Sequence, residues 1–385
     1  MPRVTMPERR DSVGRLPALD GMRGIAASIV VIYHVSLVAR PFLQTDTVGD
    51  AWWWITETPL KLLTAGTEAV LVFFVLSGLV VALPTLARGF SWVRFLTTRA
   101  LRLYLPVWGA LIFATLLVVL IPRDKAMVSQ GEWIDTTNAQ AFDLPRLLSE
   151  ASLWRQSYIF DNVLWSLRWE LIFSILLPVF VMVAVLVRRY WIVAAAIASA
   201  LTVTGRIIDL DVLVYLPVFF LGTLMAVRLP EIIDASQRLR SSRWWAIVGF
   251  SLLFIVLSWM LRPVFPAGST KSAAVWGLAG IGAAGLILAA IGFPAVRDIL
   301  SARVPQWLGK VSFSLYLVHV PVIATVAFIV GDERWWLVGL IAVPVSAGLA
   351  QVFYAFVERP AHSLARKAGS AAASGLARVR RPTAG

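Results

Sequence analysis

The chain has 385 residues, of which 59% are hydrophobic and 15% charged, with a mean hydropathy of +0.78. Soluble domains carry about 25% charged residues, so this composition excludes a soluble globular protein and predicts an integral membrane protein. The absence of cysteine excludes disulfides, thiolate metal sites and a cysteine nucleophile, and three histidines argue against a metal site. The net charge of +13 falls in short clusters between apolar runs, which is typical of membrane topology rather than of nucleic-acid binding.

Ten apolar segments are predicted to cross the bilayer as helices, which satisfy their backbone hydrogen bonds internally. We therefore predict an all-α fold, a polytopic transmembrane helical bundle of about ten spans. Most of the 35 lysines and arginines fall in alternate connections on the side of the N-terminus, so both termini are predicted to be cytoplasmic. The predicted spans are 24–40, 68–87, 102–121, 165–187, 191–205, 211–227, 244–261, 273–292, 308–330 and 335–357.

The chain begins with a basic segment, residues 1–18, which precedes the first apolar run without a small-residue cleavage pattern. This predicts a cytoplasmic N-terminal segment and a retained signal anchor rather than a cleaved signal peptide. Residues 19–360 form the predicted transmembrane domain, in which the longest connection, 122–163, is an outer loop. The Ala/Ser/Gly/Arg-rich residues 361–385 are predicted to be a disordered cytoplasmic tail.

The first span, DGMRGIAASIVVIYHVS, carries ionisable side chains that a lipid-facing helix does not need. Arg23 and His34 are eleven residues apart, so they share one helix face and are separated by about 16 Å. Asp20 resembles an N-cap, which puts Arg23 in the first turn, where the helix dipole disfavours a cation. The stretch fits two readings, a functional stripe or an orienting arginine with a histidine hydrogen-bonded inside the bundle.

The third span is entered through WVRFLTTRALRLYLP. In this segment Arg99 and Arg102 are three residues apart and share a helix face. Two roles fit these arginines: anchoring on the cytoplasmic side, or binding of phosphate groups at the cytoplasmic mouth of the bundle.

Polar residues of two later spans are predicted to converge with His34. In WSLRWELIF, Ser166 and Glu170 share a face near the outer end of the fourth span, where a carboxylate must meet a cavity or a partner. In GKVSFSLYLVHVPV, Tyr316 and His319 continue one polar stripe along the ninth span, and His319 falls at about the depth of His34. Two histidines and a glutamate at similar depth indicate one polar site.

Two other motifs carry weaker signals. In FFVLSG, the small residues Ser77 and Gly78 favour close helix packing. In FVERPAH, Glu358 marks the inner end of the last span, and His362 is predicted to be a solvated residue of the tail.

Taken together, these motifs resemble the integral-membrane acyltransferase 3 family, whose members O-acetylate bacterial surface sugars. The resemblance is carried, in family order, by LDGMRGIAA with the spacing from Arg23 to His34, FFVLSG, RALRLYLP, WSLRWE, GKVSFSLYLVHVP and VERP. It spans residues 19–360 and implies a multi-pass protein of the bacterial inner membrane. It also implies an acyl-CoA donor that enters from the cytoplasm, with acetyl-CoA the expected co-substrate and no bound cofactor.

The resemblance and the residue pattern agree on a layout for the donor and the base. Arg23, Arg99 and Arg102 are expected to hold the phosphates of coenzyme A, and no metal is expected. His34 is the expected catalytic base for transfer to a hydroxyl, because imidazole titrates near neutral pH. Direct transfer and a double displacement through acyl-His34 both remain open.

The remaining polar residues have supporting roles in this layout. Glu170 is expected to orient the imidazole or to bind the acceptor. Tyr316 and His319 are candidates for stabilising the developing oxyanion. Ser166 and Asp20 complete the predicted polar site.

The expected acceptor is a carbohydrate or a lipid-linked glycan, and the sequence leaves its identity, the acyl chain length and the oligomeric state open. A transporter or flippase for a lipid-linked or small anionic solute is the alternative function. Such a protein also has many spans, buried ionisable groups and helices interrupted by proline. The two functions differ in whether acetyl-CoA is consumed.

Overall fold

The computed structural model describes residues 16–44, 47–154 and 158–379, in which all regular secondary structure is helical and no strand occurs. The predicted N-terminal segment therefore lies largely outside the described residues. The α-helices are α1 (Pro17–Leu43), α2 (Ala51–Thr56), α3 (Gly66–Ala82), α4 (Trp92–Leu120), α5 (Trp133–Thr137), α6 (Leu144–Ala151), α7 (Leu164–Leu186), α8 (Trp191–Ile207), α9 (Asp211–Val227), α10 (Leu229–Arg238), α11 (Ser241–Met260), α12 (Thr270–Gly277), α13 (Ala279–Gly292), α14 (Pro294–Leu300), α15 (Arg303–Val330), α16 (Trp335–Phe353) and α17 (Arg359–Val379).

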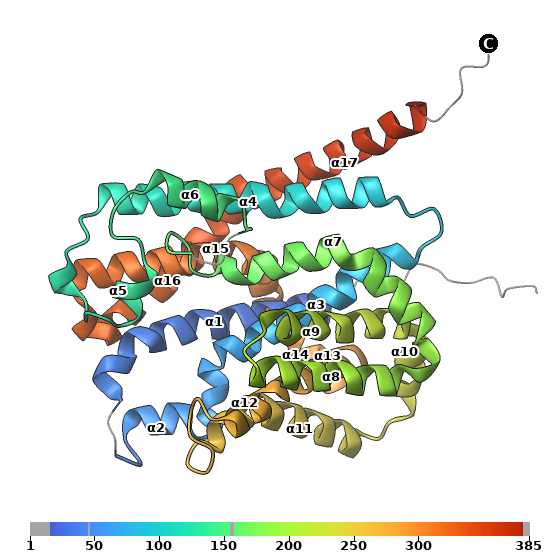
Figure 1. Cartoon of the computed structure of the whole chain (residues 1–385), viewed down its shortest axis with the longest axis horizontal. Helices are drawn as coiled ribbons and strands as arrows, with labels where there is room; N and C mark the ends of the chain where they lie inside the picture. Colours follow the sequence, from blue (N-terminus) through green and yellow to red (C-terminus); the bar gives the residue numbers. More distant parts are fainter. Residues whose placement is uncertain (1–15, 45–46, 155–157, 380–385) are drawn as a thin grey trace, which may run out of the picture.

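The long helices run side by side and form a bundle (Figure 1). In this view α4, α6 and α17 lie along one edge, α8, α11 and α12 lie along the opposite edge, and α1, α3 and α7 lie between them. Among the long apolar helices of the described residues, α15 is the most deeply buried: 83% of the residues in its most apolar stretch are buried. It packs along α1 and α16, so it places its polar residues in the interior.

Within the described residues, nine helices are long and apolar enough to cross a membrane. They coincide with nine of the ten predicted spans. The remaining predicted span is α9, a helix of 17 residues whose axis bends by 74° into α10. The predicted helical bundle is therefore confirmed, and the chain is a multi-pass membrane protein.

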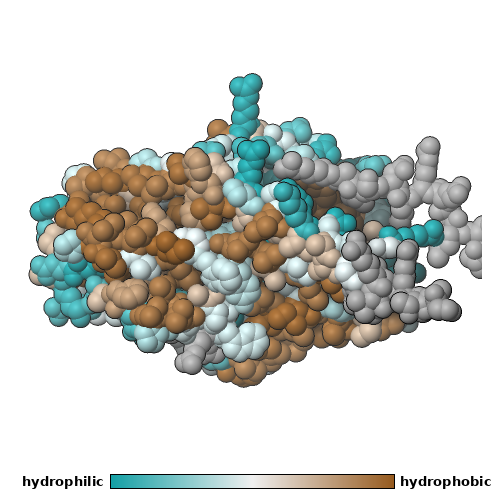
Figure 2. Space-filling model, turned by 90° about the horizontal axis from the view of Figure 1, so that it is seen from above, coloured by the Kyte–Doolittle hydropathy of each residue, from teal (hydrophilic) through white to brown (hydrophobic). Residues whose placement is uncertain are grey.

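The outer surface of the bundle is apolar where a bilayer would surround it. Ile112, Leu116 and Leu120 recur every four residues along α4 and are 63%, 51% and 72% exposed. Such a stripe on a helix surface fits contact with lipid. Figure 2 shows broad hydrophobic areas on one face of the molecule, with hydrophilic residues at its left-hand end and along its upper edge.

Glycines bring the central helices into backbone contact. A Cβ added at Gly24 of α1 would lie 2.4 Å from the backbone nitrogen of Gly309 in α15. A Cβ added at Gly78 of α3 would lie 2.0 Å from the carbonyl oxygen of Phe219 in α9. Small residues allow this close approach, as the sequence predicts for Gly78.

The C-terminal segment differs from its prediction. Residues 361–379, predicted to be disordered, belong to α17, which packs along α4 (Figure 1). Ala361 and Ala365 are buried, and Gly369 lies against Thr98 and the carbonyl of Arg94. Alanine is the strongest helix former, and its small side chain suits close packing, so this composition favours a docked helix. Residues 380–385 lie outside the described residues.

Candidate active site

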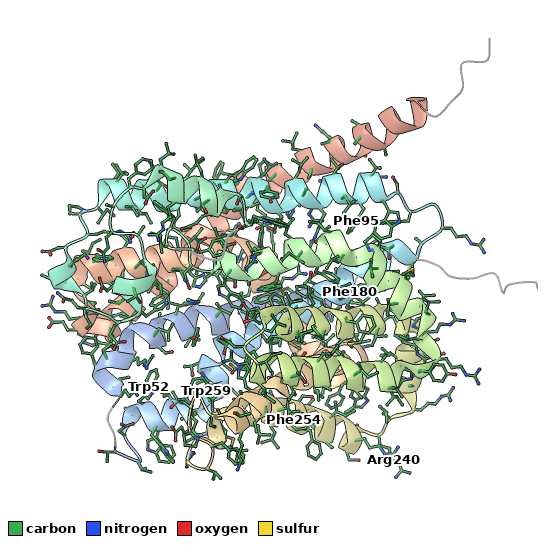
Figure 3. All side chains as sticks on the ribbon, viewed as in Figure 1. Trp52, Phe95, Phe180, Arg240, Phe254 and Trp259 are labelled. Atoms are coloured by element: carbon green, nitrogen blue, oxygen red, sulfur yellow. The ribbon has the colours of Figure 1, made fainter. Side chains whose placement is uncertain are left out.

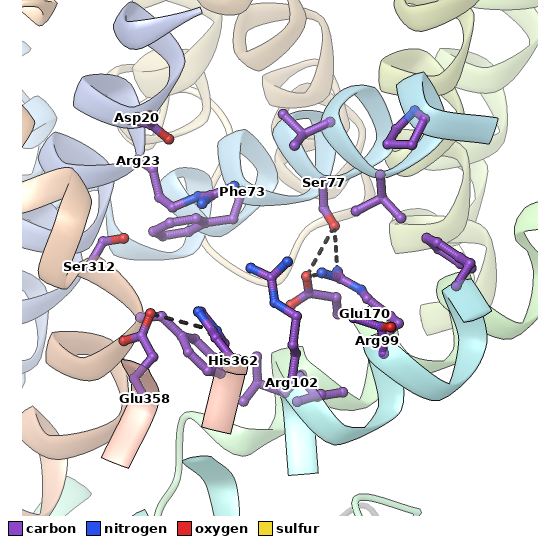
Figure 4. Close-up of a pocket in the computed structure, with 18 of the residues that line it drawn as sticks. Asp20, Arg23, Phe73, Ser77, Arg99, Arg102, Glu170, Ser312, Glu358 and His362 are labelled. Carbon is purple, nitrogen blue, oxygen red and sulfur yellow. Dashed lines mark hydrogen bonds and ion pairs between the residues drawn. The ribbon is translucent and has the colours of Figure 1, made fainter. Parts of the chain in front are cut away.

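An ion pair joins α4 and α7 at the centre of the site (Figure 4). Arg99 Nη2 pairs with Glu170 Oε1, and the two side chains are 21% and 24% exposed. The Ser77 hydroxyl of α3 donates to Glu170 Oε1 at 3.1 Å and accepts from Arg99 Nη2 at 3.3 Å. Arg99 Nε also donates to the Ser174 hydroxyl at 3.2 Å. Three helices are thus tied together by one charged network.

This pairing corrects the predicted position of Glu170. The sequence placed it near the outer end of the fourth span, beside the histidines, but its carboxylate bonds Arg99 and Ser77. The reason lies before the helix: Phe160 and Asp161 are buried, so the outer loop reaches into the bundle before α7 begins at Leu164. Figure 1 shows α7 starting part-way along α4.

A cavity of about 820 Å³ extends from this ion pair to the first turns of α1 and α4. Its volume lies within the range of about 300–1,000 Å³ that is typical of small-molecule sites. Figure 4 shows Arg23, Arg99 and Arg102 around this space. The excess of cations over carboxylates favours a ligand with several negative charges. Its charged lining comprises the cations Arg23, Arg88, Arg94, Arg99, Arg102 and Lys310 and the carboxylates of Asp20, Glu170 and Glu358.

Sequence reasoning missed two residues of this cavity. His362, predicted to be solvated, lines the cavity, and its Nε2 lies 3.9 Å from Glu358 Oε1. Glu358 is 5% exposed and accepts a hydrogen bond of 2.5 Å from the Ser314 hydroxyl. The signal was the spacing of four residues between Glu358 and His362, which puts both on one face of a continuing helix.

Tyr316 connects the cavity to the histidines. Its hydroxyl lies 2.7 Å from the Ser166 hydroxyl, and both residues line the cavity. The ring of Tyr316 is also 5.9 Å from the imidazole of His319, centroid to centroid. Of the predicted site residues, His34 and His319 do not line the cavity, and Tyr316 is the contact between the two parts.

The two histidines form a direct pair in the interior. His319 Nε2 lies 3.1 Å from His34 Nδ1, with His319 fully buried and His34 7% exposed. His34 Nδ1 also lies 2.9 Å from the carbonyl oxygen of Val30, and His319 Nδ1 lies 3.0 Å from that of Leu315. The predicted match in depth between α1 and α15 thus corresponds to a hydrogen bond.

These contacts fix the tautomers of the neutral pair. A carbonyl oxygen only accepts, so His319 Nδ1 carries a hydrogen that it donates to Leu315, and its Nε2 is an acceptor. His34 Nδ1 then donates to His319 Nε2 and to the Val30 carbonyl. His34 Nε2 has no hydrogen-bond partner among the described residues, so its lone pair is free to accept a proton.

The outer loop covers His34 with a side chain that the sequence did not single out. The ring of Trp133 in α5 lies 5.2 Å from the His34 ring, centroid to centroid. The loop is held in place by Glu150, whose carboxylate accepts the backbone N–H groups of Ile159 and Phe160 at 2.6 and 3.1 Å. Burial raises the pKa of Glu150, and it raises the pKa of the fully buried Asp161 well above its usual range.

Comparison with known proteins shows a match to the acyltransferase domain over residues 16–355. The chain is 25% identical to the "Putative peptidoglycan O-acetyltransferase YrhL" of Bacillus subtilis, over 90% of this chain and 54% of that protein. It is 28% identical to "Acyltransferase MdmB" of Streptomyces mycarofaciens, over 92% and 93% of the two chains. It is 22% identical to "O-acetyltransferase PaAT-1" of Phomopsis amygdali, over 83% and 75%. The chain thus spans about half the length of the Bacillus protein, and no solved structure matches it.

Proposed function

Because the chain belongs to the acyltransferase family whose domain it matches over residues 16–355, we propose that it is a membrane acyltransferase that uses acyl-CoA. It moves the acyl group, with acetyl the expected one, to a hydroxyl of a carbohydrate or lipid-linked glycan. Two relatives named as O-acetyltransferases support acetyl as the group and oxygen as the acceptor atom. The observation that carries the proposal is the histidine pair, which leaves one basic nitrogen free and is linked to the cationic cavity through Tyr316.

The cationic cavity suits coenzyme A, whose phosphate groups carry several negative charges. Arg23 and Arg102 supply charge-assisted donors for these phosphates, whereas Arg99 is already paired with Glu170. His34 lies about 16 Å along α1 from Arg23, which an extended pantetheine arm can bridge. The thioester then arrives next to Tyr316, at the inner end of the cavity. Both termini and this cavity are assigned to the cytoplasmic side of the bacterial inner membrane, on the charge distribution of the connections.

The free Nε2 of His34 then acts as the general base for acyl transfer. Nε2 takes the proton of the acceptor hydroxyl while the hydroxyl oxygen attacks the carbonyl carbon of the thioester. The tetrahedral oxyanion collapses, the carbon–sulfur bond breaks, and the leaving thiolate takes the proton back from the imidazolium. Tyr316 is the candidate donor for the oxyanion, because it lines the cavity and its ring contacts His319.

The geometry favours a positioning role for His319 over oxyanion stabilisation. Both of its ring nitrogens are engaged, Nδ1 with Leu315 and Nε2 with His34, so neither is left to meet a substrate. By accepting from His34 Nδ1, His319 keeps the reactive lone pair of His34 on Nε2. Glu170 is likewise assigned to holding Arg99 rather than to orienting His34.

The decisive experiment measures acetyl-CoA consumption by the purified protein in lipid nanodiscs. His34→Ala should lower turnover by about 10²–10⁴-fold, the typical contribution of a general base, while the protein still inserts and folds. Ser36→Ala, on the same helix and outside the cavity, is the matched control and should retain turnover. Full transfer by His34→Ala would refute the assignment. A wild-type protein that leaves acetyl-CoA intact would instead favour the transporter.

The same preparation separates the two chemical routes. A rapidly quenched reaction with acetyl-CoA alone should leave His34 unmodified if transfer is direct. Recovery of a His34 peptide that carries one acetyl group would show a double displacement.

A further inference from the structure

A second cavity, of about 520 Å³, lies between the α8–α9 and α11–α12 connections. Its aromatic wall comes from four helices and consists of Trp165, Tyr215, Trp259 and Trp276. In Figure 3 Trp259 lies toward the left of the molecule, whereas Phe95, which lines the cationic cavity, lies to the right. The two cavities therefore approach the interior from different ends of the bundle.

The cavities lie back to back, separated by one layer of side chains. Trp165 lines the second cavity and its neighbour Ser166 lines the first. Tyr215 of the second cavity lies 5.6 Å from Phe74 of the first, centroid to centroid. Ser166 hydrogen-bonds Tyr316, which contacts the histidine pair. The second cavity thus lies next to Ser166, the residue that links the first cavity to Tyr316 and the histidine pair.

A buried carboxylate fixes the aromatic wall. Glu68 is fully buried, and its Oε1 accepts the indole N–H of both Trp259 and Trp276 at 2.9 Å. Thr67, which lines the cavity, donates its hydroxyl to the other carboxylate oxygen at 2.9 Å. Burying a carboxylate is costly, and here the buried Lys61, whose Nζ lies 3.7 Å from the ring centroid of Trp259, acts electrostatically on Glu68 and offsets part of that cost. Tryptophans that only anchor a helix at the membrane interface do not need hydrogen bonds to a buried carboxylate, so this arrangement indicates a binding wall.

Two guanidinium groups are stacked on this wall. Arg262 Cζ lies 3.5 Å from the ring centroid of Trp259, and Arg206 Cζ lies 4.8 Å from that of Trp276. Neither guanidinium forms a hydrogen bond or a salt bridge to any residue that the structure describes, although Glu57 and Glu68 act electrostatically on Arg262 and Asp211 acts on Arg206. The carboxylate of Asp209 also lines this cavity, so the two arginines leave it with a net positive charge. Stacking orients the planar forks, whose N–H donors match the oxygens of a carboxylate or phosphate.

We propose that this second cavity is the acceptor subsite and that it takes a saccharide bearing a carboxylate or phosphate. The sugar rings lie against the aromatic wall, and Arg206 and Arg262 bind the anion. The Ser272 hydroxyl is available to the sugar hydroxyls, and the Ser269 hydroxyl can donate to them while its oxygen accepts from the Ser272 N–H. This proposal extends the proposed function and rests on it, because a ligand of this cavity is an acceptor only if the protein is an acyltransferase. The anion preference itself is a property of the cavity, measurable without turnover.

The test measures binding to the full-length protein in nanodiscs by quenching of tryptophan fluorescence. The probes are an oligosaccharide containing glucuronic acid and its neutral glucose counterpart. The acidic probe should bind at least about tenfold more tightly, which corresponds to about 1.4 kcal/mol. Arg206→Gln and Arg262→Gln should each reduce this ratio several-fold. Arg228→Gln is the matched control, because Arg228 stands 5.8 Å from the ring of Trp191 and outside both cavities.

Equal affinity for the acidic and neutral probes, or an unchanged ratio in both Arg206→Gln and Arg262→Gln, would overturn the proposal. A polyprenyl phosphate and a soluble sugar phosphate serve as competitors. Competition by either supports the anion site, and the more effective one identifies whether the phosphate is borne by lipid. Coenzyme A binding to the other cavity reports that each variant is folded. Failure of the proposed function would appear separately, as unchanged acetyl-CoA consumption in His34→Ala.

Discussion

Replacing His319 by phenylalanine tests whether the histidine pair works as base and positioning residue. The ring stays similar in size in a fully buried position, but the acceptor 3.1 Å from His34 Nδ1 is lost. The carbonyl of Val30, at 2.9 Å, remains as an acceptor, so the tautomer of His34 is weakened rather than reversed. Loss of one hydrogen bond is worth about 0.5–1.5 kcal/mol, so kcat should fall by about 2- to 13-fold, far less than for His34→Ala.

The assay is the initial rate of acetyl-CoA consumption with a saturating acceptor, analysed for kcat and for the KM of the donor. His319→Phe should change kcat and leave the donor KM at its wild-type value, because His319 lies outside the cationic cavity. His319→Gln should recover part of the rate, since an amide oxygen can accept from His34 Nδ1. A wild-type kcat in His319→Phe would refute the positioning role. A loss as large as that of His34→Ala would place His319 in the chemistry itself.

Three further predictions concern charged residues. Arg102→Ala should raise the donor KM by about 10- to 150-fold with little change in kcat, because a charge-assisted bond to phosphate is worth about 1.5–3 kcal/mol. An unchanged saturation curve would contradict this. Arg99→Ala leaves Glu170 without its cation, so it should lower stability by about 1–3 kcal/mol in thermal unfolding, and adding Glu170→Ala should recover part of the loss. Burial raises the pKa of Asp161, so the folded protein holds the proton of this carboxyl more tightly than the unfolded chain does. The free energy of unfolding therefore falls as pH rises from the unfolded pKa of about 3.9 toward the raised pKa of the folded state. Asp161→Asn should therefore raise Tm at pH 7 and flatten its dependence on pH, and a lower Tm at pH 7 would contradict the reasoning.

The part of the site predictable from sequence lies on uninterrupted helices. Arg23 and His34 stand on α1, and Tyr316 and His319 stand on α15, where counting residues gives depth directly at about 1.5 Å per residue. Both helices enter from the same end, so the match in depth between His34 and His319 could be read from the sequence. Their hydrogen bond follows from that match.

Counting residues along the predicted spans gave wrong positions where a loop folds into the bundle or where a polar segment is helical. Glu170 was misplaced because the segment before α7 is buried, which hydropathy alone does not reveal. The contact of Trp133 with His34 depends on how the outer loop folds back, and no periodicity records it. His362 was assigned to the tail because α17 is polar, yet that helix docks on α4 and carries His362 to the cavity.

The distance between the imidazoles of His34 and His319 depends on a contact between α1 and α15 that lies ten residues before each histidine. Gly24 and Gly309 bring the backbones of α1 and α15 into contact, since a Cβ at Gly24 would stand 2.4 Å from Gly309 N. His34 follows Gly24 by ten residues and His319 follows Gly309 by the same number, so both lie about 15 Å beyond the crossing. Because α1 and α15 run in the same direction from this contact, residues at the same number of positions beyond it lie at the same height along the bundle. Gly24 and Gly309 are therefore part of what places His34 Nδ1 against His319 Nε2.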